Sequence, residues 1–173
     1  MKRFLLLLSL CLSFTALTPL RADDTATELA KTHLRNIMKP DAEKLKATYA
    51  AEVTLISGHE LLKPSHGFAT DPSRATSTKV PSEKIVAFAA KQKASSDEAV
   101  DKRVASVTFS HVEVKEGDFS IEPSDAVKTP DGKLHFEIKQ GDALIKATRK
   151  SEFLLFHLRK VDGNWKVVSE YFD

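Results

Sequence analysis

Cysteine is almost missing from the sequence: Cys11 is the only one, and it lies in the apolar stretch near the N-terminus. Disulfides, thiolate zinc sites and cysteine nucleophiles are therefore excluded from the remainder of the chain. The sequence also lacks a G-x-S-x-G elbow, a G-x-G-x-x-G turn, a G-x-x-x-x-G-K-[ST] loop and an acidic calcium loop. Nothing indicates nucleotide use, and we expect no cofactor.

The first residues have the pattern of a secretory leader. Lys2 and Arg3 precede an apolar run from Phe4 to Leu12, and the small residue Ala22 precedes an acidic start. We predict a signal peptide over residues 1–22, cleavage near Ala22, and export to the periplasm or the medium. The apolar run is too short for a convincing membrane span, so none is expected after leader removal.

Leader removal changes the charge of the chain. The full sequence has 26 basic and 24 acidic residues, a net charge of +2. The leader holds Lys2, Arg3 and Arg21 and no acid, so 23 basic residues remain against 24 acidic ones, a net charge of −1. This balance gives no reason to expect a nucleic acid or an anionic membrane as partner. The remaining length, about 150 residues, suits a single domain over residues 23–173.

The first half of that domain reads as helical. Apolar residues at helical spacing predict helices over residues 26–40, 41–52 and 81–94. Tyr49 lies near the end of the second of these and faces inward with Leu45. A short strand, VTLIS, follows it, and residues 63–81 are expected to form a long irregular connection because they hold three prolines and many Ser and Thr residues.

The second half reads as β-structure. Strands are predicted over residues 104–114, with a bulge, and over 117–122, 133–139 and 143–150, and a closing hairpin covers 151–173. Helices followed by an antiparallel meander predict an α+β fold, with helices on one face of the sheet.

The closing segment LLFHLRKVDGNWKVVSEYF has an apolar strand, a D-G turn and a W-x-V-x-x-x-Y/F pattern. Together with DAEKLKATYAAEVTLIS near the start, it resembles the NTF2-like superfamily, which includes the SnoaL-like proteins, over about residues 24–173. The resemblance implies N-terminal helices packed on a strongly curved antiparallel sheet, which together form a cone. Its members include isomerases, dehydratases, cyclases and hydrolases, and also proteins that only bind a ligand or a partner. None of the family's catalytic patterns matches this chain, so no catalytic residue is assigned.

The register of the closing hairpin decides where His157 points. A two-residue turn at Asp162-Gly163 places His157 opposite Val168, on the face away from the only tryptophan, Trp165. A three-residue turn that includes Asn164 shifts the register by one and puts His157 on the tryptophan side. We favour the two-residue turn because it collects more apolar residues on one face. Its predicted pairs are Leu158–Val167, Phe156–Ser169 and Leu154–Tyr171.

Two groups of residues are candidates for function. The candidates for a ligand site inside the cone are Tyr49, Trp165 and Tyr171. The candidates for a self-association surface on the outer sheet face are Phe153, Leu155, His157 and Phe172. Relatives of the resembled family often dimerise through that face, so a homodimer is expected. His157 is then an interface residue or a hydrogen-bonded sheet residue.

No metal site is predicted, because His59, Glu60 and His66 in GHELLKPSH do not have the spacing of metal ligands. The first function hypothesis is a non-catalytic module that binds a small apolar ligand or another protein outside the cytoplasm. The alternative is a cofactor-independent isomerase, dehydratase or cyclase that works by general acid–base chemistry in the cone. Two or more titratable groups converging in an enclosed cavity would favour the enzyme.

Overall fold

The computed structural model describes residues 22–56, 77–121 and 133–172. These residues form four helices, α1 (Ala22–Met38), α2 (Ala42–Thr48), α3 (Ser82–Ala89) and α4 (Asp97–Ala105). They also form eight strands, β1 (Tyr49–Ile56), β2 (Thr78–Pro81), β3 (Thr108–Val112), β4 (Gly117–Ile121), β5 (Leu134–Ile138), β6 (Ala143–Arg149), β7 (Glu152–Val161) and β8 (Asn164–Phe172). The predicted leader, except for Ala22, lies outside the described residues.

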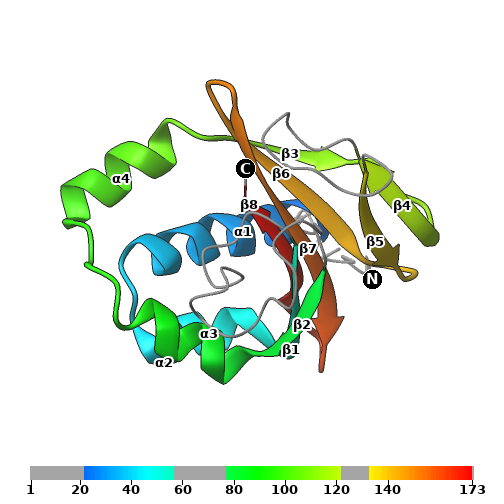
Figure 1. Ribbon diagram of the computed structural model, residues 1–173. Coiled ribbons are helices and arrows are strands. Elements are labelled where there is room, and N and C mark those ends of the chain that lie inside the picture. Colours follow the sequence, from blue (N-terminus) through cyan, green and yellow to red (C-terminus); the bar gives the residue numbers. More distant parts are fainter. Residues whose placement is uncertain (1–21, 57–76, 122–132, 173) are drawn as a thin grey trace, which may run out of the picture.

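Six of the strands form one curved sheet. Their order is β2-β1-β8-β7-β6-β3, and all neighbours are antiparallel except β1 and β8, which run parallel. Strands β4 and β5 form a separate two-stranded ribbon. Figure 1 shows the large sheet bending around α1, with α2 and α3 on the same side. The predicted α+β fold, with N-terminal helices packed on a curved and mostly antiparallel sheet, is confirmed.

The concave face of the sheet, which the helices cover, carries the larger apolar cluster. Alternate residues of each strand point to this face because side chains in a strand alternate. Fully buried members include Ala26 and Ala30 of α1, and Leu55, Phe156 and Leu158 of the sheet. Burial of a Leu or Phe side chain stabilises the fold by about 1.5–3 kcal/mol. The packing of α1, α2 and α3 on the sheet therefore contributes much of the stability.

The convex face carries a second apolar cluster, which the β4–β5 ribbon covers. Phe136 and Ile138 of β5 pack there with Leu144, Leu155 and Tyr171 of the large sheet. Each of these five side chains is buried. The convex face is therefore shielded by a part of the same chain.

Helix α4 was not predicted, because its residues were assigned to a strand that begins at Val104 and to the segment before it. The structure shows why a helix forms there. The Ser96 side chain caps the helix by accepting a hydrogen bond from the Ala99 amide, and Asp97 and Glu98 lie in the first turn. Arg35 of α1 and Lys39, the residue after the helix, then form ion pairs with Asp101 and Asp97 of α4.

Two other boundaries differ from the prediction. Helix α2 ends at Thr48, whose hydroxyl donates to the carbonyl of Leu45, and Tyr49 already has the extended backbone of β1. The prediction that Tyr49 lies at the end of a helix is therefore wrong. Residues 78–81 pair with β1 as β2, so the predicted irregular connection does not extend to Pro81. Within the described residues, no helix is long and apolar enough to cross a membrane.

Candidate functional site

A bulge in β8 sets which side chains reach the space between helices and sheet. The hairpin turn at Asp162-Gly163 has two residues with positive φ, 50° and 78°, and pairs Val161 with Asn164, as predicted. The regular register continues to Leu158–Val167 and then shifts, so that His157 pairs with Ser169. Val168 is the extra residue. An extra residue turns every side chain beyond it to the opposite face.

The predicted pairs beyond this point are wrong for that reason. Phe156 pairs with Glu170, and Leu155 pairs with Tyr171. Tyr171 therefore lies on the convex face, where its ring centroid is 5.4 Å from that of Phe153, and not on the Trp165 face. The bulge thus exchanges the faces on which Glu170 and Tyr171 lie. It brings the carboxylate of Glu170 onto the concave face.

Glu170 joins three other polar side chains in a buried polar cluster, which consists of His33, Thr48, Tyr49 and Glu170. They come from α1, α2, β1 and β8, and all four are buried. His33 Nε2 lies 3.0 Å from Glu170 Oε2, and His33 Nδ1 lies 2.7 Å from Thr48 Oγ1. The Tyr49 hydroxyl donates to both Glu170 oxygens, at 2.9 and 3.1 Å. Helix α1 and strand β1 thus meet β8 at one carboxylate, and His33 links this contact to α2 through Thr48.

The hydrogen bonds of Thr48 determine the tautomer of His33. The Thr48 hydroxyl has one proton, and it donates this proton to the Leu45 carbonyl at 2.7 Å. It must therefore accept from His33, so Nδ1 of the imidazole carries a proton. A second proton lies between Nε2 and Glu170 Oε2, because two lone pairs do not face each other at hydrogen-bond distance.

Aromatic rings hold the imidazole of His33 from two sides. The His33 ring meets Tyr49 and Phe156 edge-on, with centroids 4.6 and 5.4 Å apart. Burial raises the pKa of the Tyr49 hydroxyl well above its ordinary value, and the charge and hydrogen bond of Glu170 raise it further. Tyr49 is therefore a neutral donor at any physiological pH.

The buried polar cluster contains the residue types that general acid–base catalysis uses. However, the side chains of His33 and Glu170 have 0% exposed surface. A general base must come within hydrogen-bond reach of its substrate. In this arrangement the groups that could act as acid or base, His33, Tyr49 and Glu170, are bonded to one another.

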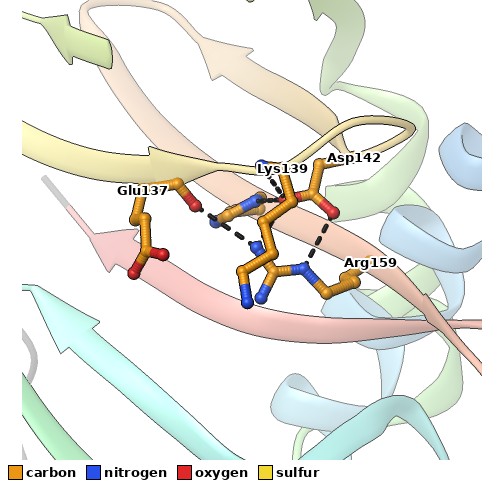
Figure 2. A network of polar contacts seen from close by, with 5 residues as sticks. Glu137, Lys139, Asp142 and Arg159 are labelled. Carbon is orange, nitrogen blue, oxygen red and sulfur yellow. Dashed lines mark hydrogen bonds and ion pairs between the residues drawn. The ribbon is translucent and has the colours of Figure 1, made fainter. Parts of the chain in front are cut away.

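A second polar group, the convex-face ion cluster, consists of Asp142, His157 and Arg159. The Asp142 carboxylate accepts from Nε and an Nη atom of Arg159, at 2.9 and 2.6 Å, and lies 2.8 Å from His157 Nε2. It also accepts from the Lys139 amide at 2.8 Å, and Arg159 donates to the Glu137 carbonyl at 3.3 Å. Figure 2 shows Arg159 reaching Asp142 beneath the connection that Lys139 begins. The cluster thereby fastens the β5–β6 turn to β7.

Charge and burial act on the groups of this ion cluster. Burial lowers the pKa of His157, and the nearby Asp142 carboxylate opposes that shift only in part. Burial also raises the pKa of Asp142, but hydrogen bonds from Arg159, the Lys139 amide and His157 bring it below its ordinary value. The cluster therefore favours an ionised aspartate beside a neutral histidine.

The predicted interface residues are not equally accessible. Leu155 and His157 are buried under the β4–β5 ribbon, and the His157 ring meets Phe136 edge-on at 6.3 Å. Neither side chain is open to a second copy in this structure. Phe153 is half-buried, and the side chain of Phe172 lies outside the described residues.

The predicted pocket residues are separated in the structure. Tyr49 belongs to the buried polar cluster, and Tyr171 lies on the other face of the sheet. Trp165 is half-buried on the concave face, where its Nε1 donates to Thr25 of α1 at 3.0 Å and Lys160 lies 5.1 Å from its ring. Only Tyr49 and Trp165 therefore share a face.

Sequence reasoning missed His33, Glu170 and Asp142 as site residues. One signal was present for His33, since it lies three residues after Ala30 and seven after Ala26, on the buried stripe of α1. His59, Glu60 and His66 lie outside the described residues. In the part of the chain that the structure describes, no three potential metal ligands come together.

Comparison with known proteins gives similarity at the level of structure only. No family model matches the chain, and no curated protein matches its sequence. An NTF2-like protein of unknown function from Shewanella baltica is 13% identical, with 90% of this chain and 95% of that chain covered and a TM-score of 0.46. A second, from Silicibacter pomeroyi, is 10% identical over 87% of this chain and 93% of that one, with a TM-score of 0.44. A third, from Methylobacillus flagellatus, is 13% identical over 87% and 89%, with a TM-score of 0.42. The chain is thus similar over most of its length to proteins that carry the family name its sequence resembles.

Proposed function

We propose that the chain is an exported binding domain that holds a small apolar ligand and does not catalyse a reaction. One observation carries this proposal: the titratable groups between helices and sheet are bonded to one another and have no exposed surface at His33 and Glu170. A catalytic group has to touch its substrate, whereas a buried and mutually bonded cluster fixes the packing of α1 and α2 on the sheet.

Half-buried apolar side chains around the core support an apolar ligand. Met38 of α1, Phe88 of α3, Phe109 of β3, Leu154 of β7 and Trp165 of β8 all pack against the concave-face core and remain partly exposed. Small-molecule sites are lined mainly by apolar and aromatic side chains, the kinds gathered here.

Native mass spectrometry of the protein purified from its own periplasm or medium tests this proposal. We expect a bound species of low mass that disappears when the protein is denatured and extracted with an organic solvent. A protein that carries nothing, and that binds no member of a panel of apolar probes, contradicts it. A polypeptide that co-purifies in fixed proportion also contradicts the small ligand and favours a protein partner.

The convergence of His33, Tyr49 and Glu170 favours a second candidate function, a cofactor-independent isomerase, dehydratase or cyclase. This function requires the buried polar cluster to open to a substrate. Carbethoxylation by diethyl pyrocarbonate, located by peptide mass spectrometry, measures that opening. The exposed residues His111 and His135 serve as internal controls. The binding proposal expects His33 to stay unmodified while both controls react, and comparable modification of His33 supports the enzyme.

Export and dimer formation belong to the same proposal. The leader pattern at residues 1–22 supports export, and the intact mass of the recovered protein tests it, with an N-terminus at Asp23 expected. Homodimer formation stays a prediction, and the same native spectra report it. A clean monomer at micromolar concentration contradicts it.

A further inference from the structure

One end of the concave face carries an apolar row, defined here as Phe109, Ala147 and Leu154. Ala147 of β6 pairs with Phe109 on one side and with Leu154 on the other. Directly opposed residues of antiparallel strands point to the same face. All three pack against the concave-face core, and Phe109 and Leu154 remain half-buried. The row therefore offers apolar surface to a ligand.

Arg149 lies on the same face as the apolar row, two residues beyond Ala147 in β6. Its Nε donates to the Ser106 hydroxyl at 3.1 Å, and Ser106 in turn donates to the Arg103 carbonyl at 2.6 Å. The end of α4 thereby orients the guanidinium of Arg149. Within the described residues, no carboxylate forms an ion pair with it.

Two other positive charges near this row are paired. Lys31 of α1, whose Nζ lies 6.0 Å from the Phe109 ring centroid, pairs with Glu28 at 2.6 Å. Arg103 of α4 pairs at 3.5 Å with Glu152, the residue opposite Arg149 in the β6–β7 hairpin. Arg149, by contrast, has no ion-pair partner within the described residues and lies on the face of the apolar row.

From this juxtaposition we infer that the ligand is a single-chain amphiphile, with its tail on the apolar row and one anionic head on Arg149. A guanidinium binds carboxylate and phosphate groups through paired hydrogen bonds, so either head satisfies the site. The inference rests on the proposed binding function and names the chemical class of its ligand. Figure 1 shows the neighbourhood, where the link from α4 to β3 passes the tip of the β6–β7 hairpin.

Equilibrium dialysis of the full mature protein with decanoate, decyl phosphate and decanol, each below its micellar concentration, tests the inference. We expect one or both anions to bind about tenfold more tightly than decanol, a difference of about 1.4 kcal/mol. The anion that binds more tightly identifies the head group. Arg149→Gln should weaken anion binding about tenfold and leave decanol binding unchanged. The matched control Lys150→Gln removes a neighbouring positive charge and should change neither.

Several results overturn the inference, and they differ from a failure of the proposed function. If decanol binds as tightly as the anions and Arg149→Gln changes the affinity for none of them, the assignment of an anionic head group is wrong. The proposal of an apolar ligand would then still hold. If Arg149→Gln weakens the binding of all three ligands equally and Arg149→Lys does not restore it, Arg149 acts by stabilising the fold. That result also overturns the inference. If no probe binds and the purified protein carries nothing, the proposed function fails together with the inference.

Discussion

The carboxylate of Glu170 lies 3.0 Å from Nε2 of His33, although 137 residues separate the two along the chain. This contact joins the first helix to strand β8, and Tyr49 and Thr48 extend it to β1 and α2. Buried polar groups that bond to one another strengthen each member, because the surroundings have a low dielectric constant. The loss of one member therefore affects the whole cluster.

Glu170→Ala should lower the free energy of unfolding by roughly 3–5 kcal/mol, because it leaves His33 and Tyr49 buried without their shared partner. Urea unfolding followed by the fluorescence of Trp165 measures this change. Glu28→Ala is the control, since Glu28 is exposed and pairs only with Lys31 on the surface of α1. A Glu170→Ala protein within about 1 kcal/mol of the wild type contradicts the prediction.

Tyr49→Phe should cost about 1–3 kcal/mol by itself, since it removes the donor to both oxygens of Glu170. In the Tyr49→Phe/Glu170→Ala double variant, the two losses should not add, and the coupling energy should fall between about 0.5 and 3 kcal/mol. The same unfolding measurements complete the double-mutant cycle. Strict additivity would show that the two side chains act independently.

Deletion of Val168 tests the bulge directly. Without the extra residue, β8 pairs regularly with β7, so Glu170 stays opposite Phe156 and Tyr171 stays opposite Leu155. We therefore expect the deletion to cost only about 1 kcal/mol, much less than Glu170→Ala, seen as a small shift of the unfolding midpoint in circular dichroism. Val168→Ala keeps the residue count and should cost about as much. A loss as large as that of Glu170→Ala would mean that Val168 is not the extra residue.

The convex-face ion cluster should make stability depend on pH. Burial lowers the pKa of His157 in the folded protein, so the unfolded chain takes up this proton first as the pH falls. The contribution of His157 to the free energy of unfolding is fully present above the pKa of histidine in the unfolded chain, about 6.5. It is lost as the pH falls from there toward the pKa of His157 in the folded protein. Wild type should therefore lose more stability than His157→Gln between about pH 7.5 and 5.5, by up to about 1 kcal/mol. An equal loss in both proteins contradicts the prediction.

Since the pKa of Asp142 is also lowered, its contribution is lost only at more acidic pH, below about 4.

The closing hairpin turn offers a local test. Asp162 and Gly163 both have positive φ, which glycine adopts without strain and alanine does not. Gly163→Ala should destabilise the protein by about 1 kcal/mol or more, whereas Asp162→Asn should be close to neutral because asparagine also suits this turn. Thermal unfolding of both variants measures the difference. A neutral Gly163→Ala would argue against the two-residue turn.

Local patterns were sufficient to predict the order of most elements. Alternating apolar residues identified the strands around Phe136 and Ile145, and the Asp162-Gly163 pair identified the turn between β7 and β8. Helix α4 was missed because only Val100 and Val104 of its residues are buried apolar side chains, while its clear signal was the cap at Ser96. Tyr49 was placed on a helix because the apolar spacing of α2 continues into β1.

The candidate site was harder to predict, because it depends on a change of register that leaves no local pattern. In a regular hairpin Glu170 would face the same way as Val168 and Lys166, away from the side of the sheet on which His33 lies. Its partners His33 and Tyr49 come from α1 and β1, which are distant in sequence, and His33 in turn contacts Thr48 of α2. One extra residue, Val168, thus determines a contact that only the tertiary structure reveals.

The position of β8 between β1 and β7 bears on how the protein acquires its fold. The strand that pairs with the first strand of the sheet is also the last one to be synthesised among the described elements. Until residues 164–172 emerge, β1 and β2 have no attachment to the meander of β6 and β7, and His33 lacks its carboxylate. Such long-range pairing is slow to form. Assembly of the sheet is therefore expected only after nearly the whole chain is available, and under the proposed export this order would keep the chain unfolded and translocatable until synthesis is nearly complete.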